Sequence, residues 1–179
     1  MMKSGIVALT FLFASFTSAS PALVARTCSP SFTADQSIYA LLPMTDVVNE
    51  WTPQSNSSGA QIVLETRSAR DAFMQGEFSM LTQKNGLYGI IPAFRTQIPV
   101  ALTAGDNGNL TFGFAGLLSI PTQQFNITCD ECSEVRQGNC TIKHPASGQC
   151  IIGSNGGDTL SLGSCDKAGV YYFTPAGSA

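Results

Sequence analysis

The chain has 179 residues, of which 44% are hydrophobic and 12% charged, and its formal net charge is −3. This composition predicts a folded protein, because disordered chains combine low hydrophobicity with high charge. The nine basic side chains form no basic run, so we expect no nucleic acid as a partner, since phosphate binding needs clustered positive charge. The chain has a single histidine, His144, which argues against histidine-based catalysis and against a multi-histidine metal site. We expect no metal and no cofactor.

Residues 1–19 have the pattern of a secretory signal peptide. Lys3 supplies a positive charge, residues 6–16 form an apolar stretch, and residues 17–19 (Thr-Ser-Ala) are the small residues that signal peptidase requires. The apolar stretch is shorter than the roughly 18 to 20 residues that cross a bilayer. We therefore expect cleavage after residue 19 and secretion without a membrane anchor. An N-terminal segment (20–30) and a single domain (31–176) would follow.

Six cysteines lie beyond the predicted cleavage site: Cys28, Cys129, Cys132, Cys140, Cys150 and Cys165. An even number of cysteines in a secreted protein predicts three disulfides, whose pairing spacing alone does not fix. The spacing would also fit a zinc site, and Cys129-Asp-Glu-Cys132 would fit a redox pair. Structural bridges are the favoured interpretation, because thiols in an oxidising compartment usually end as disulfides.

A secreted chain can be N-glycosylated at Asn-x-Ser/Thr sequons, and four are present, at Asn56, Asn109, Asn126 and Asn139. We expect Asn139 to be the least favourable acceptor, because its neighbour Cys140 can enter a bridge early.

An internal repeat of about 48 residues is the strongest signal in the chain. Three strand-like segments, centred on Leu64, Phe112 and Leu160, follow one another at this interval. A cluster of turn residues that tolerate positive φ precedes each segment (56–59, 106–108 and 155–157). Several landmarks in the same order indicate a duplicated structural unit.

Two further sets of landmarks keep this spacing. Phe78, Phe125 and Phe173 recur at nearly the same interval, and we expect all three to fill the core. Tyr39-Ala-Leu-Leu-Pro43 is echoed one repeat later by Tyr88-Gly-Ile-Ile-Pro92. A third copy, at positions 140–145, arrives later than the interval requires, and the additional residues coincide with the cysteine-rich insertion at 129–140.

Three units of about four short strands each, over residues 31–80, 81–128 and 129–176, predict an all-β protein. One unit cannot bury its own apolar face, so the three must share a core. Closing their strands with pseudo-threefold symmetry gives a β-trefoil, which leaves few open sheet edges. The alternative is a β-sandwich, which has no reason to repeat at this interval.

The last unit resembles a ricin-B-type lectin repeat. The resemblance rests on Ile142, the Ser-Gly-x-Cys run that ends at Cys150, the Leu-x-x-Cys run that ends at Cys165, and the aromatic run 171–173. Gln123-Gln-Phe125 matches the Gln-x-Trp motif that ends such repeats. The cysteine pattern, with Cys28-Ser-Pro and Glu50-Trp51 near the N-terminus, is also similar to small secreted proteins of basidiomycete fungi.

This resemblance implies a β-trefoil, a disulfide between Cys150 and Cys165, and one shallow sugar site per unit. Such a site combines an acidic residue after the first cysteine, an aromatic ring for the apolar sugar face, and polar amides. Here Ile151 and Ile152 follow Cys150, and Tyr171 replaces the glutamine. The sugar contacts are therefore expected to be degenerate.

Four residues are the candidate carbohydrate contacts: Trp51, Gln123, Asp166 and Tyr171. Trp51, the sole tryptophan, could be a sugar platform or a residue that caps the barrel. His144 precedes a proline and is typical of a turn, and no Gly-x-Ser-x-Gly elbow accompanies it. We therefore expect no enzyme, and a monomer that binds glycans or a glycoprotein surface. The alternative is a secreted interaction or protease-inhibitor protein without sugar binding.

Overall fold

The computed structural model describes residues 27–32, 38–66, 76–93, 98–115, 120–133 and 136–175. The predicted signal peptide (1–19) and residues 20–26 of the predicted N-terminal segment lie outside the described residues. Within these ranges the chain forms short strands and two 3₁₀ turns. No helix in the described part is long and apolar enough to cross a membrane.

The strands, in chain order, are grouped by repeat unit. The first unit contains β1 (Ile38–Pro43), β2 (Asn49–Pro53), β3 (Ile62–Thr66) and β4 (Glu77–Thr82). The second contains β5 (Tyr88–Pro92), β6 (Val100–Ala104), β7 (Leu110–Phe114), the turn η2 (Pro121–Gln123) and β8 (Asn126–Thr128). The third contains β9 (Glu131–Cys132), β10 (Gln137–His144), β11 (Gln149–Ile152), β12 (Ser161–Gly163), the turn η3 (Cys165–Lys167) and β13 (Tyr171–Pro175).

Six strands, two from each unit, close into a barrel: β1, β4, β5, β8, β10 and β13. Antiparallel pairing runs from β1 to β4, from β4 to β5, from β8 to β10, from β10 to β13 and from β13 back to β1. A bridge between Tyr88 and Phe125 joins β5 to the start of β8 and completes the ring. This closure excludes the alternative β-sandwich, in which two separate sheets would face each other.

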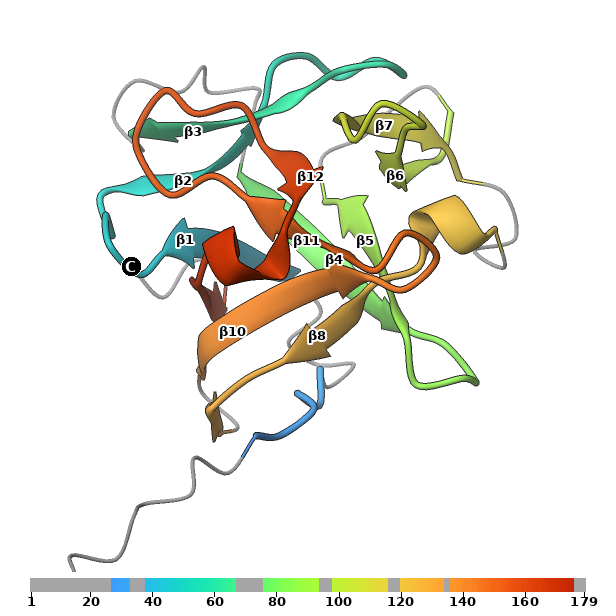
Figure 1. Ribbon diagram of the computed structural model, residues 1–179. Helices are drawn as coiled ribbons and strands as arrows, with labels where there is room; N and C mark the ends of the chain where they lie inside the picture. The colour runs from blue at the N-terminus through green and yellow to red at the C-terminus, as the bar shows by residue number, and fades with distance from the viewer. Residues whose placement is uncertain are drawn as a thin grey trace, which may run out of the picture.

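The remaining strands form three hairpins, β2–β3, β6–β7 and β11–β12. Isolated bridges join each hairpin to the other two: Gln61 to Thr111, Val63 to Thr159 and Asn109 to Ser161. In Figure 1 the hairpins lie toward the upper end of the molecule, above the barrel strands β8 and β10. The hairpins thus cover one end of the barrel.

The predicted core fillers are confirmed. Phe78, Phe125 and Phe173 are completely buried. Each faces an equivalent position on a neighbouring strand: Tyr39 opposes Phe78, Tyr88 opposes Phe125 and Gln137 opposes Phe173. A second layer, Leu64, Phe112 and Leu160, is also buried.

Glycine provides the positive φ that the repeated turns require. Gly59, Gly108 and Gly157 end the predicted turn clusters with φ of 89°, 80° and 87°. Residues with a Cβ rarely adopt this backbone conformation, so three glycines at equivalent positions give the three hairpins the same turn.

The third unit departs from threefold symmetry inside β10. Its pairing with β13 shifts register between Gln137 and Cys140, which is the signature of a β-bulge, and Asn139 has a positive φ of 51° there. Gln137, rather than the predicted Cys140, occupies the position equivalent to Tyr39 and Tyr88. One extra residue of this unit is therefore accommodated as a bulge within the predicted insertion.

Candidate functional site

Trp51 does not present a ring face to solvent, so the prediction of a sugar platform at this residue is wrong. The side chain is completely buried in β2 and packs edge-on against Phe78 and Tyr171, with ring centroids 6.0 Å and 5.2 Å away. The pairing of β2 with β3 sets Trp51 opposite Leu64 on the apolar face of the hairpin. The alternative prediction for Trp51 is a residue that caps the barrel, and its complete burial in the β2–β3 hairpin is consistent with that role.

Tyr171 is likewise an interior residue rather than a sugar contact. It is completely buried at the start of β13, and its hydroxyl donates a hydrogen bond to the Gly153 carbonyl oxygen at 2.8 Å. Burial raises the pKa of Tyr171, and the negative charge of Asp158 raises it further. The hydroxyl therefore stays protonated and ties β13 to the loop after β11.

Gln123 is buried in η2, and the prediction that it contacts sugar is also wrong. Its side-chain amide donates to the hydroxyl of Thr103 at 3.0 Å and to the carbonyl oxygen of Phe114 at 2.8 Å. Both donor hydrogens are thereby used inside the second unit. The Gln-x-Phe motif joins η2 to the β6–β7 hairpin.

Asp166 is the one candidate contact that is exposed. It lies in η3, and its carboxylate accepts a hydrogen bond from the Ser164 hydroxyl. The position after Cys150 that holds an acid in the resembling family is filled by Ile151, which is buried, and Ile152, which is partly buried. The predicted residues therefore do not converge on one site, because three belong to the interior.

A hollow with a mixed polar and apolar lining lies instead between the first and third units. It has a volume of about 290 Å³ and is lined by Asn49, Leu64, Glu65, Thr66, Gly156 and Gly157. Glu65 is partly buried, and its carboxylate has no hydrogen bond or ion pair with any described residue. Free carboxylate oxygens beside an amide and a hydroxyl are groups that bind hydroxyl-rich ligands.

The local backbone explains how this hollow forms. The Gly157 amide donates to the Leu64 carbonyl oxygen at 2.7 Å, which holds the glycine turn of the third unit against β3. A Cβ at Gly156 would lie 2.8 Å from the side-chain nitrogen of Asn49, so glycine is needed for this close approach. The sequence marked residues 155–157 only as a turn, because contact with Glu65 depends on the tertiary structure.

A second hollow, of about 370 Å³, lies beside the first predicted sequon and is lined by Asn56, Ser57, Ser58 and Ile98. Asn56 and Asn109 are exposed, whereas Asn126 and Asn139 are partly buried. The Asn139 side-chain oxygen is buried and lacks a hydrogen-bond partner.

The six cysteines form three disulfides, Cys28–Cys132, Cys129–Cys140 and Cys150–Cys165. The pairing implied by the lectin-like repeat, Cys150 with Cys165, is confirmed. The bridges exclude the zinc and Cys129–Cys132 redox alternatives, because every cysteine is paired. Three disulfides are consistent with an extracellular protein.

His144 is buried at the end of β10, and both ring nitrogens have partners. Nε2 lies 3.1 Å from the Pro121 carbonyl oxygen and Nδ1 lies 2.9 Å from the Ser147 hydroxyl. Because a carbonyl oxygen only accepts, Nε2 carries the proton in this arrangement. Across the described ranges, no three His, Cys, Asp or Glu side chains are placed to hold a metal ion.

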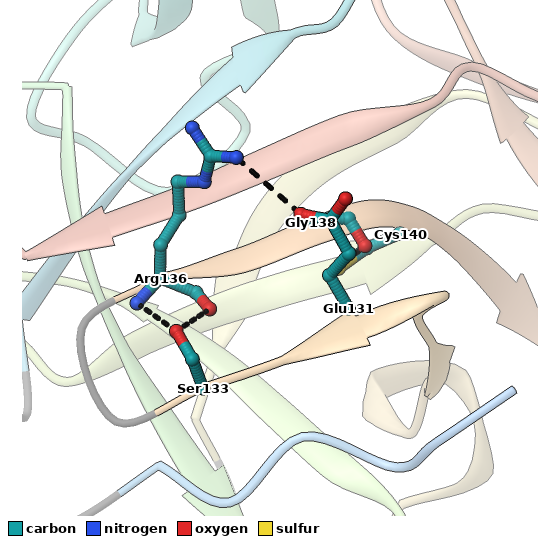
Figure 2. A network of polar contacts seen from close by, with 5 residues as sticks. All are labelled: Glu131, Ser133, Arg136, Gly138 and Cys140. Atoms are coloured by element: carbon teal, nitrogen blue, oxygen red, sulfur yellow. Dashed lines mark hydrogen bonds and ion pairs between the residues drawn. The ribbon is translucent and has the colours of Figure 1, made fainter. Parts of the chain in front are cut away.

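The cysteine-rich insertion carries a charged surface cluster, which Figure 2 shows from close by. Arg136 forms an ion pair with Glu131 at 3.3 Å, and its guanidinium lies over the Tyr172 ring, 4.8 Å from the centroid. The Ser133 hydroxyl donates to the Arg136 carbonyl oxygen and accepts from its amide, which closes the turn. Both members of the ion pair are more than half exposed, so the pair adds little stability.

No protein-family model and no curated protein matches the sequence. Solved structures do match the fold. The designed three-fold symmetric protein ThreeFoil is 14% identical, with a TM-score of 0.59 over 77% of this chain and 98% of its own. The Haemophilus ducreyi cytolethal distending toxin is 14% identical, with a TM-score of 0.60 over 81% of this chain and 87% of the toxin chain.

A mosquitocidal holotoxin is also similar, with 11% identity and a TM-score of 0.61 over 78% of this chain. This chain spans only 17% of that toxin's length. At such low identities the similarity concerns the fold, and the matched structures are β-trefoils. The barrel closure, the three joined hairpins and these structures agree: the chain is a β-trefoil protein, as its resemblance to ricin-B-type repeats predicted.

Proposed function

We propose that the chain is a secreted, non-catalytic carbohydrate-binding protein, and that its sugar site is the hollow that contains Asn49, Glu65 and Gly156. The observation that carries the proposal is the Glu65 carboxylate, which is partly buried beside the hollow and has no partner among the described residues. A carboxylate in that setting can accept hydrogen bonds from two neighbouring sugar hydroxyls.

The size of the hollow suits a small ligand. Its volume of about 290 Å³ lies at the lower limit of small-molecule pockets. Thr66 adds a hydroxyl at the rim, and the paired turn of Gly156 and Gly157 lets a ligand approach the backbone closely. These features favour one sugar residue, such as a chain end, over a long oligosaccharide.

A glycan array with the secreted, oxidised protein tests this proposal. Glu65→Gln keeps the shape of the side chain but removes its charge, and we expect it to weaken binding at least tenfold. Gly156→Ala places a methyl group against Asn49 and should abolish binding by filling the hollow. Glu77→Gln is the matched control, because Glu77 is also partly buried but lies on β4, outside the residues that line the hollow.

Asp166→Asn separates this site from the one that the sequence predicted. Binding that is lost in this variant and kept in Glu65→Gln would place the sugar in the third unit and overturn the proposed location. If a folded sample binds no glycan on the array, the carbohydrate function itself is rejected.

One observation favours the alternative, a secreted interaction or inhibitor protein. The loop between β1 and β2 exposes three apolar side chains, Met44, Val47 and Val48, the last two 57% and 59% exposed. The loop is held by a hydrogen bond from the Thr45 hydroxyl to the Ser154 carbonyl oxygen and one from the Met44 amide to Val170. Exposed apolar residues on an anchored loop are typical of protein contacts.

The two functions predict different effects of the same variants. Val47→Asp with Val48→Asp should leave glycan binding unchanged if the hollow is the site. If the protein instead inhibits a protease or binds a protein, the double variant should lose that activity and Glu65→Gln should keep it.

A further inference from the structure

The N-terminal residues 27–32 lie across the end of the barrel that the hairpins leave open. In Figure 1 this blue segment lies at the lower end of the molecule, below β8 and β10 and opposite the hairpins. Its Phe32 ring packs against three rings of the barrel end, those of Tyr39, Tyr88 and Phe173, at centroid distances of 5.0, 5.4 and 5.4 Å. One phenylalanine from outside the barrel strands therefore contacts all three units.

This aromatic contact coincides with the break in threefold symmetry. Two of the three equivalent positions at this end are tyrosines, Tyr39 and Tyr88, and the third is Gln137, opposite Phe173. The segment thus supplies an aromatic ring to a barrel end whose own third aromatic residue is missing.

Among the described residues, backbone and side-chain hydrogen bonds and the packing of Cys28 and Phe32 against the core hold the segment in place. Two backbone hydrogen bonds join Cys28 to Cys129, and the Tyr88 hydroxyl donates to the Pro30 carbonyl oxygen at 2.7 Å. Together with the Phe32 ring, these contacts oppose the conformational entropy that the segment gains on release. The disulfide from Cys28 to Cys132 adds a covalent constraint to these contacts.

The two disulfides formed by Cys28, Cys129, Cys132 and Cys140 differ in their accessibility. Cys132 is exposed and Cys28 is half-buried, whereas Cys129 and Cys140 are both buried. Disulfide exchange requires access of a thiolate to a sulfur atom. A reductant should therefore reach Cys28–Cys132 before Cys129–Cys140, and the buried bridge keeps β8 and β10 joined after the first has opened.

We propose that Cys28–Cys132 is a reducible clasp that holds Phe32 in the open end of the barrel, and that its reduction uncovers an aromatic cavity. A thiolate of a reducing dithiol attacks the Cys132 sulfur, and the electron pair of the broken bond leaves with the Cys28 sulfur, which takes up a proton. The second thiol then displaces the Cys132 sulfur, which also gains a proton, and the reductant departs as a disulfide. The segment 27–32 is then held by its non-covalent contacts alone.

Graded reduction with dithiothreitol tests the order of opening. Trapping free thiols with iodoacetamide and mapping them by mass spectrometry should show Cys28 and Cys132 modified at reductant concentrations that leave Cys129 and Cys140 paired. Reduction of Cys129–Cys140 first, or of both bridges together, would overturn the proposal.

The uncovered cavity is measured with the dye 1-anilinonaphthalene-8-sulfonate, which brightens on exposed apolar surface. We expect its emission to rise severalfold in step with modification of Cys28. Trp51 reports on the rest of the fold, because its buried ring contacts Phe78 and Tyr171 and not the segment. Its emission maximum should stay constant while the dye signal rises. A red shift that accompanies the dye signal would mean general unfolding and would reject the clasp.

Two variants make the test independent of reductant. Phe32→Ala in the oxidised protein should bind the dye as strongly as the reduced wild type, and Cys28→Ser with Cys132→Ser should do so without any reductant. The matched control is Cys150→Ser with Cys165→Ser, which removes the other bridge with an exposed cysteine and should leave dye binding low. Full modification of Cys28 without a rise in dye emission would refute the release of Phe32.

Discussion

Tyr171 and Gly169 are packed so closely that a Cβ at Gly169 would lie 2.1 Å from the tyrosine hydroxyl and 2.9 Å from the Gly153 carbonyl oxygen that accepts its hydrogen bond. A methyl group at this position cannot be accommodated unless the ring moves, and the ring is fixed by Trp51. We expect Gly169→Ala to lower the free energy of unfolding by about 3 kcal/mol, the upper range for overpacking. Urea denaturation would measure this loss.

The control for Gly169 is Gly157, where a Cβ would meet open space but the backbone φ is +87°. Gly157→Ala should cost about 1 kcal/mol, because only the backbone conformation is strained. Equal losses in the two variants would contradict the steric explanation.

The Tyr171 hydroxyl should make the protein sensitive to alkali. Burial, helped by the charge of Asp158, raises its pKa in the folded state above the ordinary value of 10. The folded state therefore holds this proton more tightly than the unfolded state, and the stabilisation is complete below pH 10 and lost as the pH rises further. The melting temperature of the wild type should fall more steeply above pH 10 than that of Tyr171→Phe. If the melting temperatures of the two proteins fell equally with rising pH, a buried hydroxyl at Tyr171 would be contradicted.

Asp158 should have the opposite effect, at acid pH. Hydrogen bonds from the backbone amides of Asn155 and Ser154, both 3.0 Å long, lower the pKa of its carboxyl below the ordinary 3.8. Its stabilisation is therefore present at neutral pH and lost as the pH falls through the lowered pKa. Asp158→Asn should melt below the wild type at pH 7, and the difference should shrink below about pH 4. A difference that stays constant from pH 7 to pH 2 would show that charge is not involved.

The three equivalent phenylalanines should be equally important for stability. Phe125→Ala removes a completely buried ring and should cost about 3–5 kcal/mol, and the same change at Phe78 or Phe173 should cost a similar amount. Phe114→Ala is the matched control, since Phe114 is 59% exposed on β7 and should change stability by less than about 1 kcal/mol. Chemical denaturation of the four variants gives the comparison.

Two of the four sequons should carry glycans when the chain passes through a eukaryotic secretory pathway. Asn56 and Asn109 are exposed, whereas the Asn139 side-chain oxygen is buried in the β10 bulge. Intact-mass measurement before and after enzymatic deglycosylation should show loss of one glycan in Asn56→Gln and one in Asn109→Gln. Asn139→Gln should leave the mass of the glycans unchanged, and a glycan on Asn139 would contradict the burial argument.

The fold was largely predictable because repetition makes one pattern appear three times. The regular spacing of Leu64, Phe112 and Leu160 reflects a requirement of the closed barrel, in which equivalent positions need equivalent side chains. The Cys150–Cys165 bridge was predictable from the resemblance, because both cysteines lie within one unit.

The candidate site could not be predicted in the same way. Trp51, Gln123 and Tyr171 have the side chains that sugar sites use, but the same amphipathic groups also serve as interior residues, and only burial distinguishes the two roles. Glu65 could not be predicted as a site residue, because a single acid on a strand is common and the turn of Gly156, from another unit, comes beside it only in the folded chain.

The sequence by itself determined the strand class, the threefold repeat and the oxidised state of the cysteines, since these depend on local pattern and on counts within the chain. The tertiary structure alone decided that Cys28 pairs with Cys132 across 104 residues, that Phe32 enters the barrel end, and that Glu65 faces a hollow. Contacts between distant segments follow from how the three units close into one barrel, and that closure is a property of the whole chain rather than of any single stretch.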